Sequence, residues 1–250
     1  MTALKEFAPK LYLTELLLDD FDVRGALILS DTHAVVWDTL SHPRDMQPVL
    51  PLLRDKRLWI VYSHADWDHV WGTAGLPPGE IFAHSEAYAR FAADVPQELN
   101  AKKLEQPGAW DAVSLVPPQM VFSGQLHLDL GGLTLELHHL PGHTRDCLVG
   151  FIPQWGVLLA GDTLETPLPV VNEDSPLALW IEGLARWQGD ERVKTVIPAH
   201  GETGDRQLIA RNIAYLRSLI DGREYDDLPA IMSAFYHDTH AKNKIYARRA

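Results

Sequence analysis

The sequence predicts an α/β protein with two β-sheets that are covered by helical layers. Two strand-rich blocks are each followed by helical segments, and no internal repeat or low-complexity tract divides the chain. Several apolar runs also end in short clusters of histidine and aspartate. With 250 residues, of which 46% are hydrophobic and 22% charged, the chain can bury a substantial core.

The first block is rich in expected strands. They are Leu11–Leu18, Ala26–Ser30, Ala34–Asp38, Leu58–Tyr62 and Glu80–Ala83. A helix is expected over Asp45–Arg54, and Ser85 is expected to cap a second helix that runs to Ala93. A loop-rich stretch through Pro107 and Pro118 then follows.

The second block opens with the strongest hairpin signal in the chain. Strands over Gln125–Leu130 and Leu133–Leu140 flank two glycines, which favour the positive φ angles of a tight turn. The remaining expected elements are the strands Cys147–Ile152, Val157–Ala160 and Val193–Ile197, and the helices Pro176–Gln188, Gly204–Ile220 and Leu228–His240. We expect residues 1–250 to form one domain, with 221–250 as a C-terminal helical extension.

The charge balance of the chain indicates which classes of binding partner to expect. Lys and Arg number 22 against 34 Asp and Glu, which gives a formal net charge of −12 and argues against nucleic-acid binding. Neither a signal peptide nor an apolar run of about 18 residues is present, so a membrane partner is not expected. We therefore expect a cytoplasmic protein whose partner is a small-molecule substrate.

The single cysteine limits the metal ligands that the chain can offer. Cys147 alone can form neither an intramolecular disulfide nor a cysteine-based zinc cluster, so histidine and carboxylate remain. A reducing compartment fits this composition. Cys147 itself is expected to be a buried small hydrophobic residue and not a nucleophile.

Four polar clusters follow predicted strands. They are Ser63-His64-Ala65-Asp66-Trp67-Asp68-His69, Pro141-Gly142-His143-Thr144, Gly161-Asp162-Thr163 and Pro198-Ala199-His200-Gly201. A rigid sheet can direct such loop residues into one cavity. Imidazoles and carboxylates gathered there would need a cation to offset desolvation and repulsion, and two divalent ions would do so. Imidazole and carboxylate suit zinc, iron or manganese, and metal-assisted hydrolysis is the chemistry that such a pair favours.

This pattern resembles the signature of the metallo-β-lactamase superfamily, which is His-x-His-x-Asp-His followed by single His, Asp and His positions. The resemblance covers roughly residues 11–220 and implies a four-layered αββα sandwich. By this resemblance the ligands are His64 and His143 at one metal, Asp68, His69 and His200 at the other, and Asp162 as a bridge. Asp38 matches a family aspartate that supports the motif loop by hydrogen bonding.

One position departs from the family pattern, because Asp66 stands where its second histidine is expected. As a ligand, this carboxylate would favour iron or manganese, with zinc still allowed. The alternative is a turn-capping carboxylate that points away from the metal. The flavodiiron branch of the superfamily carries a glutamate at this place, which keeps open a di-iron redox protein that uses an external electron donor.

The resemblance implies a hydrolase that attacks a small ester or thioester through a metal-bridging hydroxide oriented by Asp68; lactones and phosphodiesters are further candidate substrates. A metal-binding module without turnover is another alternative. Trp67 and Trp71 flank the motif and could wall the pocket, or pack beneath the loop. His240, on the last predicted helix, is a candidate substrate-side residue, although packing or solvation explains it equally well.

Overall fold

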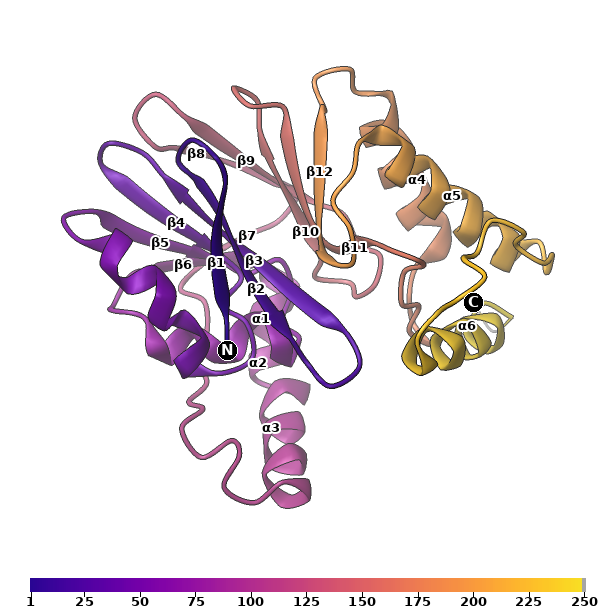
Figure 1. The fold of residues 1–250 in the computed structure, drawn as a ribbon, viewed down its shortest axis with the longest axis horizontal. Coiled ribbons are helices and arrows are strands. Elements are labelled where there is room, and N and C mark those ends of the chain that lie inside the picture. Colours follow the sequence, from indigo (N-terminus) through magenta and orange to yellow (C-terminus); the bar gives the residue numbers. More distant parts are fainter. Residues whose placement is uncertain (249–250) are drawn as a thin grey trace.

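A computed structural model describes residues 1–248 of the chain. Seven strands form the first sheet, in the order β1-β2-β3-β4-β5-β6-β7, and this sheet lies beside a second sheet at the centre of the molecule (Figure 1). Its strands are β1 Ala3–Ala8, β2 Leu11–Leu17, β3 Asp22–Leu29, β4 His33–Trp37, β5 Arg57–Val61, β6 Glu80–His84 and β7 Met120–Phe122. Pairing is antiparallel from β1 to β4 and parallel from β4 to β7.

The second sheet has five strands in the order β12-β11-β10-β9-β8. They are β8 Gln125–Asp129, β9 Thr134–His139, β10 Leu148–Ile152, β11 Val157–Glu165 and β12 Thr195–His200. The predicted hairpin is present, and Gly131 and Gly132 adopt φ angles of 75° and 91° in its turn. The last pair, β11 and β12, is parallel.

Helices cover the outer faces of both sheets (Figure 1). They are α1 Trp67–Val70, α2 Ser85–Phe91, α3 Asp94–Glu105, α4 Leu177–Gly189, α5 Arg206–Ile220 and α6 Ala234–Tyr246, together with 3₁₀ segments at Pro43–Leu53 and Trp71–Gly75. The α/β class and the four-layered αββα arrangement predicted from the sequence are therefore confirmed.

Apolar side chains fill three layers between these elements. One cluster lies between the two sheets, where Trp37 of β4 and Leu148 of β10 are both buried. The close packing there requires Gly150, because a Cβ at this position would lie 2.7 Å from the Trp37 ring. The other two clusters lie between each sheet and its helices, so both faces of each sheet are covered.

Several predicted boundaries differ from the structure. The helix expected over Asp45–Arg54 is instead a 3₁₀ segment that spans Pro43–Leu53. The cap of α2 is His84 and not Ser85, since the His84 imidazole accepts the Glu86 N–H. The last helix begins after Ser233, whose hydroxyl accepts the Tyr236 N–H, and so it lies six residues further along the chain than predicted.

Five elements were not predicted. α1 and the 3₁₀ segment Trp71–Gly75 lie where the motif loop was expected to continue. β1 pairs at the edge of the first sheet, β7 has only three residues, and α3 lies within the stretch expected to be loops. α3 buries only Val95 and Leu99 in 12 residues, so its sequence carries almost no amphipathic signal.

Within residues 1–248, no helix is long and apolar enough to cross a membrane. The predicted C-terminal extension, 221–250, contains α6, while its last two residues, 249–250, lie outside the described residues. The assignment of the whole chain to one domain stays a prediction.

Candidate metal centre

The seven predicted metal ligands converge where strands of both sheets end. His64 and Asp66 lie in the loop after β5, and Asp68 and His69 lie on α1. His143 lies in the loop between β9 and β10, Asp162 on β11, and His200 at the end of β12. Residues separated by up to 136 positions thus meet in one place.

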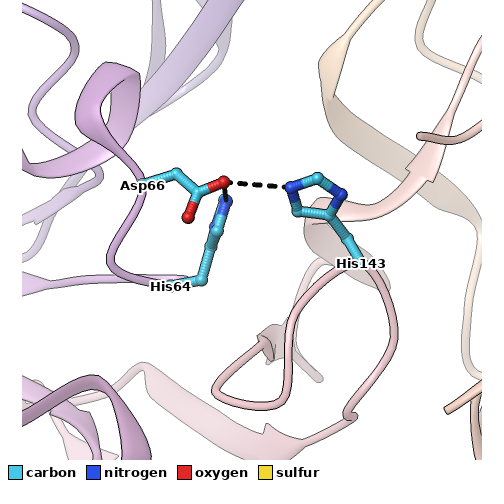
Figure 2. Close-up of side chains that lie close together, drawn as sticks. All are labelled: His64, Asp66 and His143. Carbon is cyan, nitrogen blue, oxygen red and sulfur yellow. Dashed lines mark hydrogen bonds and ion pairs between the residues drawn. The ribbon is translucent and has the colours of Figure 1, made fainter. Parts of the chain in front are cut away.

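The first group consists of His64, Asp66 and His143, whose candidate ligand atoms all lie within 4.8 Å of one another. Asp66 Oδ2 lies 3.0 Å from His143 Nε2 and 3.5 Å from His64 Nε2. Figure 2 shows both imidazoles directed at this one oxygen. Asp66 makes no side-chain capping bond to α1, so the capping alternative is wrong.

The second group consists of Asp68, His69 and His200. Asp68 Oδ1 lies 3.7 Å from His69 Nε2, and Asp68 Oδ2 lies 3.7 Å from His200 Nε2. All three side chains are buried. The spacing leaves the two imidazole nitrogens and the carboxylate facing a common point.

Asp162 lies between the two groups and approaches both. Its Oδ2 is 3.5 Å from His64 Nε2 and 3.3 Å from His200 Nε2, and its Oδ1 is 3.2 Å from His69 Nε2. A carboxylate in this position can contact a metal in each group through its two oxygens. The bridging position predicted for Asp162 agrees with this geometry.

Three buried polar atoms of the centre lack a hydrogen-bond partner: His64 Nε2, His69 Nε2 and Asp162 Oδ1. Unpaired buried polar atoms are costly and rare in folded proteins. Divalent cations would give each of these atoms a partner, and neutral imidazoles with carboxylates form the donor set of zinc, iron and manganese sites. The residues present therefore fit a metal centre.

The other nitrogen of each ligand histidine has its own partner. His143 Nδ1 lies 3.0 Å from the Val170 carbonyl, and His200 Nδ1 lies 2.5 Å from the Asp22 carbonyl. His64 Nδ1 lies 3.0 Å from Ser63 Oγ. A carbonyl can only accept, so Nδ1 of His143 and of His200 carries a proton, and Nε2 is the nitrogen that faces the centre and can bind a metal once it has lost its own proton.

Asp38 supports the motif loop from beneath. Its Oδ2 lies 2.9 Å from His69 Nδ1, and its two oxygens accept the N–H and the hydroxyl of Ser63, each at 2.7 Å. The side chain is fully buried, and the backbone has a φ of 56°, a left-handed conformation that aspartate tolerates. Ser63, which belongs to the predicted cluster but had no role assigned to it, links Asp38 to His64 through its hydroxyl.

The electrostatics of the metal-free centre couple the imidazoles and carboxylates. Burial alone would raise the pKa of Asp162, but His200, His69 and His64 hold it well below its usual range. Burial alone would lower the pKa of His143, but the hydrogen bond and charge of Asp66 raise it to about 9. The pKa of His200 rises to about 10 because the attraction of Asp162 exceeds the effect of burial.

Trp180 of α4 holds two of the site loops together. Its indole N–H donates to the Thr163 carbonyl at 2.9 Å, next to Asp162. Its ring also packs on Gly142, where a Cβ would lie 2.7 Å from the ring atoms. The glycine beside His143 is therefore required by close packing against Trp180.

The structure gives different positions to the three predicted substrate-side residues. Trp71 is fully buried in the core beneath the motif loop, so its ring cannot wall a substrate pocket. Trp67 is partly buried, and Lys102 Nζ lies 3.9 Å from its ring centre. His240 lies 2.9 Å from the Tyr215 hydroxyl. The substrate-side roles of Trp67 and His240 stay predictions.

Comparison with known proteins places this centre in a family. The family model described as the metallo-β-lactamase superfamily matches residues 21–200, which contain all seven candidate ligands. The chain belongs to the metallo-β-lactamase superfamily. Members of this superfamily are mostly hydrolases that bind divalent metal ions, and the His and Asp groups of the chain fit that class.

Individual relatives are distant. A metallo-β-lactamase type 2 from Bacillus cereus is 25% identical over 201 residues, which cover 76% of this chain and 69% of that protein. A hydroxyacylglutathione hydrolase from Anaeromyxobacter dehalogenans (strain 2CP-C) is 27% identical over 152 residues, or 59% of this chain and 41% of that protein. A solved metallo-β-lactamase from Pontibacter korlensis has a TM-score of 0.70 at 18% identity, covering 87% of this chain and 99% of that chain, which shows the fold alone.

Proposed function

We propose that this member of the metallo-β-lactamase superfamily is a binuclear metal-dependent hydrolase that acts on a small ester or thioester. The carrying observation is a pair of three-residue groups with Asp162 between them, in which three buried polar atoms make no hydrogen bond. Such an arrangement is costly without cations and suits two of them.

The candidate ligands divide into two sets. His64, Asp66 and His143 would hold one ion, Asp68, His69 and His200 would hold the other, and Asp162 would contact both. Divalent ions bound there would activate a water molecule and polarise the oxygen of the substrate's electrophilic centre. Zinc, iron and manganese all suit this donor set, and the carboxylate of Asp66 favours iron or manganese.

Asp68 is the residue that we assign to orienting the attacking water. Its side chain is buried, and its oxygens lie 3.7 Å from the Nε2 atoms of His69 and His200. A carboxylate held this way accepts a hydrogen bond from water and directs the oxygen lone pair at the substrate. Its rigid position on α1 reduces the entropy lost when the water is aligned.

The charges around the centre favour substrates that are not polyanions. A cavity of about 470 Å³ adjoins Asp66, and it is lined by six carboxylates and only two arginines: Asp66, Glu86, Asp94, Glu98, Asp146, Asp174, Arg90 and Arg145. Together with the net charge of −12, this disfavours phosphodiesters. The relative named hydroxyacylglutathione hydrolase takes an acylated thiol, which is the thioester chemistry that we propose here.

A substrate panel tests the proposal. Hydrolysis of p-nitrophenyl acetate, an acylated glutathione, a lactone and a phosphodiester is measured before and after chelation, and again after zinc, manganese or iron(II) is added. We expect ester or thioester hydrolysis that chelation abolishes and metal restores. Mutation of a residue that only hydrogen-bonds to a metal ligand typically lowers activity by about 10–100-fold. Asp162→Asn should lower the hydrolysis rate by more than this, because Asp162 is proposed to bind metal directly. A protein that binds two ions but hydrolyses none of the four would contradict the proposal.

A further inference from the structure

Arg90 of α2 lies beside the metal centre without belonging to the predicted ligand set. Its Nη1 is 2.7 Å from Asp66 Oδ1, although the two residues are 24 positions apart in the chain. The side chain is 22% exposed, as is that of Asp66, so the pair sits at the border between the buried centre and the adjoining cavity.

The two oxygens of Asp66 have separate partners. Oδ1 faces the guanidinium of Arg90, while Oδ2 faces His143 Nε2 at 3.0 Å and His64 Nε2 at 3.5 Å. Figure 2 shows Oδ2 lying between the two imidazoles and the other oxygen turned away from them. A free carboxylate can bind a metal through one oxygen or both, and rotation of its side chain exchanges them.

We infer that Arg90 is a positioning residue that fixes Asp66 as a one-oxygen metal ligand through Oδ2. The inference rests on the proposed metal centre. Arg90 would orient Asp66 in the way that the carbonyl of Val170 orients His143. In both cases the partner binds the side-chain atom that faces away from the metal centre. A carboxylate that replaces an imidazole needs such a partner, since ligand orientation depends on the groups behind the ligand.

Arg90 is itself held by two further carboxylates. Its Nη1 lies 3.1 Å from Asp146 Oδ1, and its Nη2 lies 2.8 Å from Asp94 Oδ2. Asp146 is fully buried, and its other oxygen accepts the Ala65 N–H at 2.8 Å. One aspartate therefore ties the guanidinium to the backbone of the motif loop, directly before Asp66.

Orientation, and not charge neutralisation, is the role that this geometry supports. One guanidinium faces Asp66, Asp94 and Asp146, so this group of four side chains keeps a net negative charge when all are ionised. The planar guanidinium can meet several carboxylate oxygens in fixed directions, which a lysine ammonium does not do.

Metal affinity of purified full-length variants tests the inference. Cobalt(II) and zinc are titrated in competition with a chromophoric chelator, and the cobalt absorption bands report ligand geometry. We expect Arg90→Gln to weaken binding of one of the two ions by about 10–100-fold and to change the cobalt spectrum. Arg90→Lys, which keeps the charge, should recover only part of the affinity.

Arg145→Gln is the matched control. Arg145 lines the same cavity but pairs with Asp174 at 3.5 Å, so its loss changes the charge equally without touching Asp66. If Arg90→Gln and Arg145→Gln lose metal affinity equally, the effect of Arg90 is one of charge, and the positioning role is overturned. Wild-type affinity and spectrum in Arg90→Gln, or a wild-type protein that binds no second ion, would also overturn it. If the wild type binds two ions but hydrolyses nothing, only the proposed function fails.

Discussion

Replacement of Asp38 by asparagine should weaken metal binding by changing which nitrogen of His69 carries the proton. Asp38 Oδ2 accepts from His69 Nδ1 at 2.9 Å, which leaves His69 Nε2 free to bind a metal. In Asp38→Asn the amide oxygen can still accept the Ser63 N–H, and the amide nitrogen then faces His69 Nδ1 as a donor. His69 would have to accept that bond, so its proton would move to Nε2 and block the ligand position.

The expected magnitudes follow from the burial and bonding of Asp38. The side chain is fully buried and accepts three hydrogen bonds, of which two end on the oxygen that the substitution removes. Losing a hydrogen bond to a charged group costs about 1.5–3 kcal/mol in the free energy of unfolding. For a chain of this size that is a fall of about 3–12 °C in the melting temperature. Metal affinity should fall by about 10–100-fold.

The assay compares Asp38→Asn with Asp45→Asn in chelator competition and thermal unfolding of the metal-free protein. Asp45 is a matched control because it is also buried and accepts hydroxyl bonds from Ser41 and Thr2, but it lies outside the metal centre. Both variants should lose stability, and only Asp38→Asn should lose metal affinity. Wild-type affinity and two bound ions in Asp38→Asn would refute the tautomer argument.

Four further predictions concern the centre and its packing. Asp66→His should shift metal preference toward zinc, as measured by competition between zinc and manganese, and unchanged metal binding would show that Asp66 is no ligand. Because the pKa values of His143 and His200 are raised to about 9 and about 10, metal binding must release their protons, so affinity should rise with pH up to that range. The same shifts stabilise the metal-free fold fully below pH 6.5, and this stability is lost as the pH rises through 9 to 10, which denaturant titrations would detect. Gly142→Ala should cost about 1–3 kcal/mol, seen as a lower denaturation midpoint, because its Cβ would lie 2.7 Å from the Trp180 ring; an unchanged midpoint would contradict this packing.

The convergence of the candidate ligands could be predicted because they lie in short clusters that follow predicted apolar strands. His64 and His143 lie in loops after strands, and His200 ends β12. Asp162 instead lies within β11, which continues to Glu165 and past the predicted strand end at Ala160. The two sheets bring the four residues together. Asp38 was also predictable, since the motif loop needs a hydrogen-bond partner below it and the residue ends a strand.

Other parts of the site have no local signal. Arg90 reaches Asp66 only because α2 packs beside the motif loop, and Asp146 acts through one backbone N–H. An arginine on a short helix and an aspartate in a loop are common in any sequence, so nothing marks them before the fold is known. Trp71 shows the opposite case, because its place beside the motif suggested a pocket wall while the fold buries it in the core.

Elemental analysis of protein purified without added metal tests the central claim most directly, because it reports both the identity and the number of ions per chain. The geometry of two three-residue groups with Asp162 between them predicts about two ions per chain. Two zinc or manganese ions would support the hydrolase, and two irons would favour the redox alternative. A protein that binds one ion or none, even after metal is supplied, would contradict a binuclear centre.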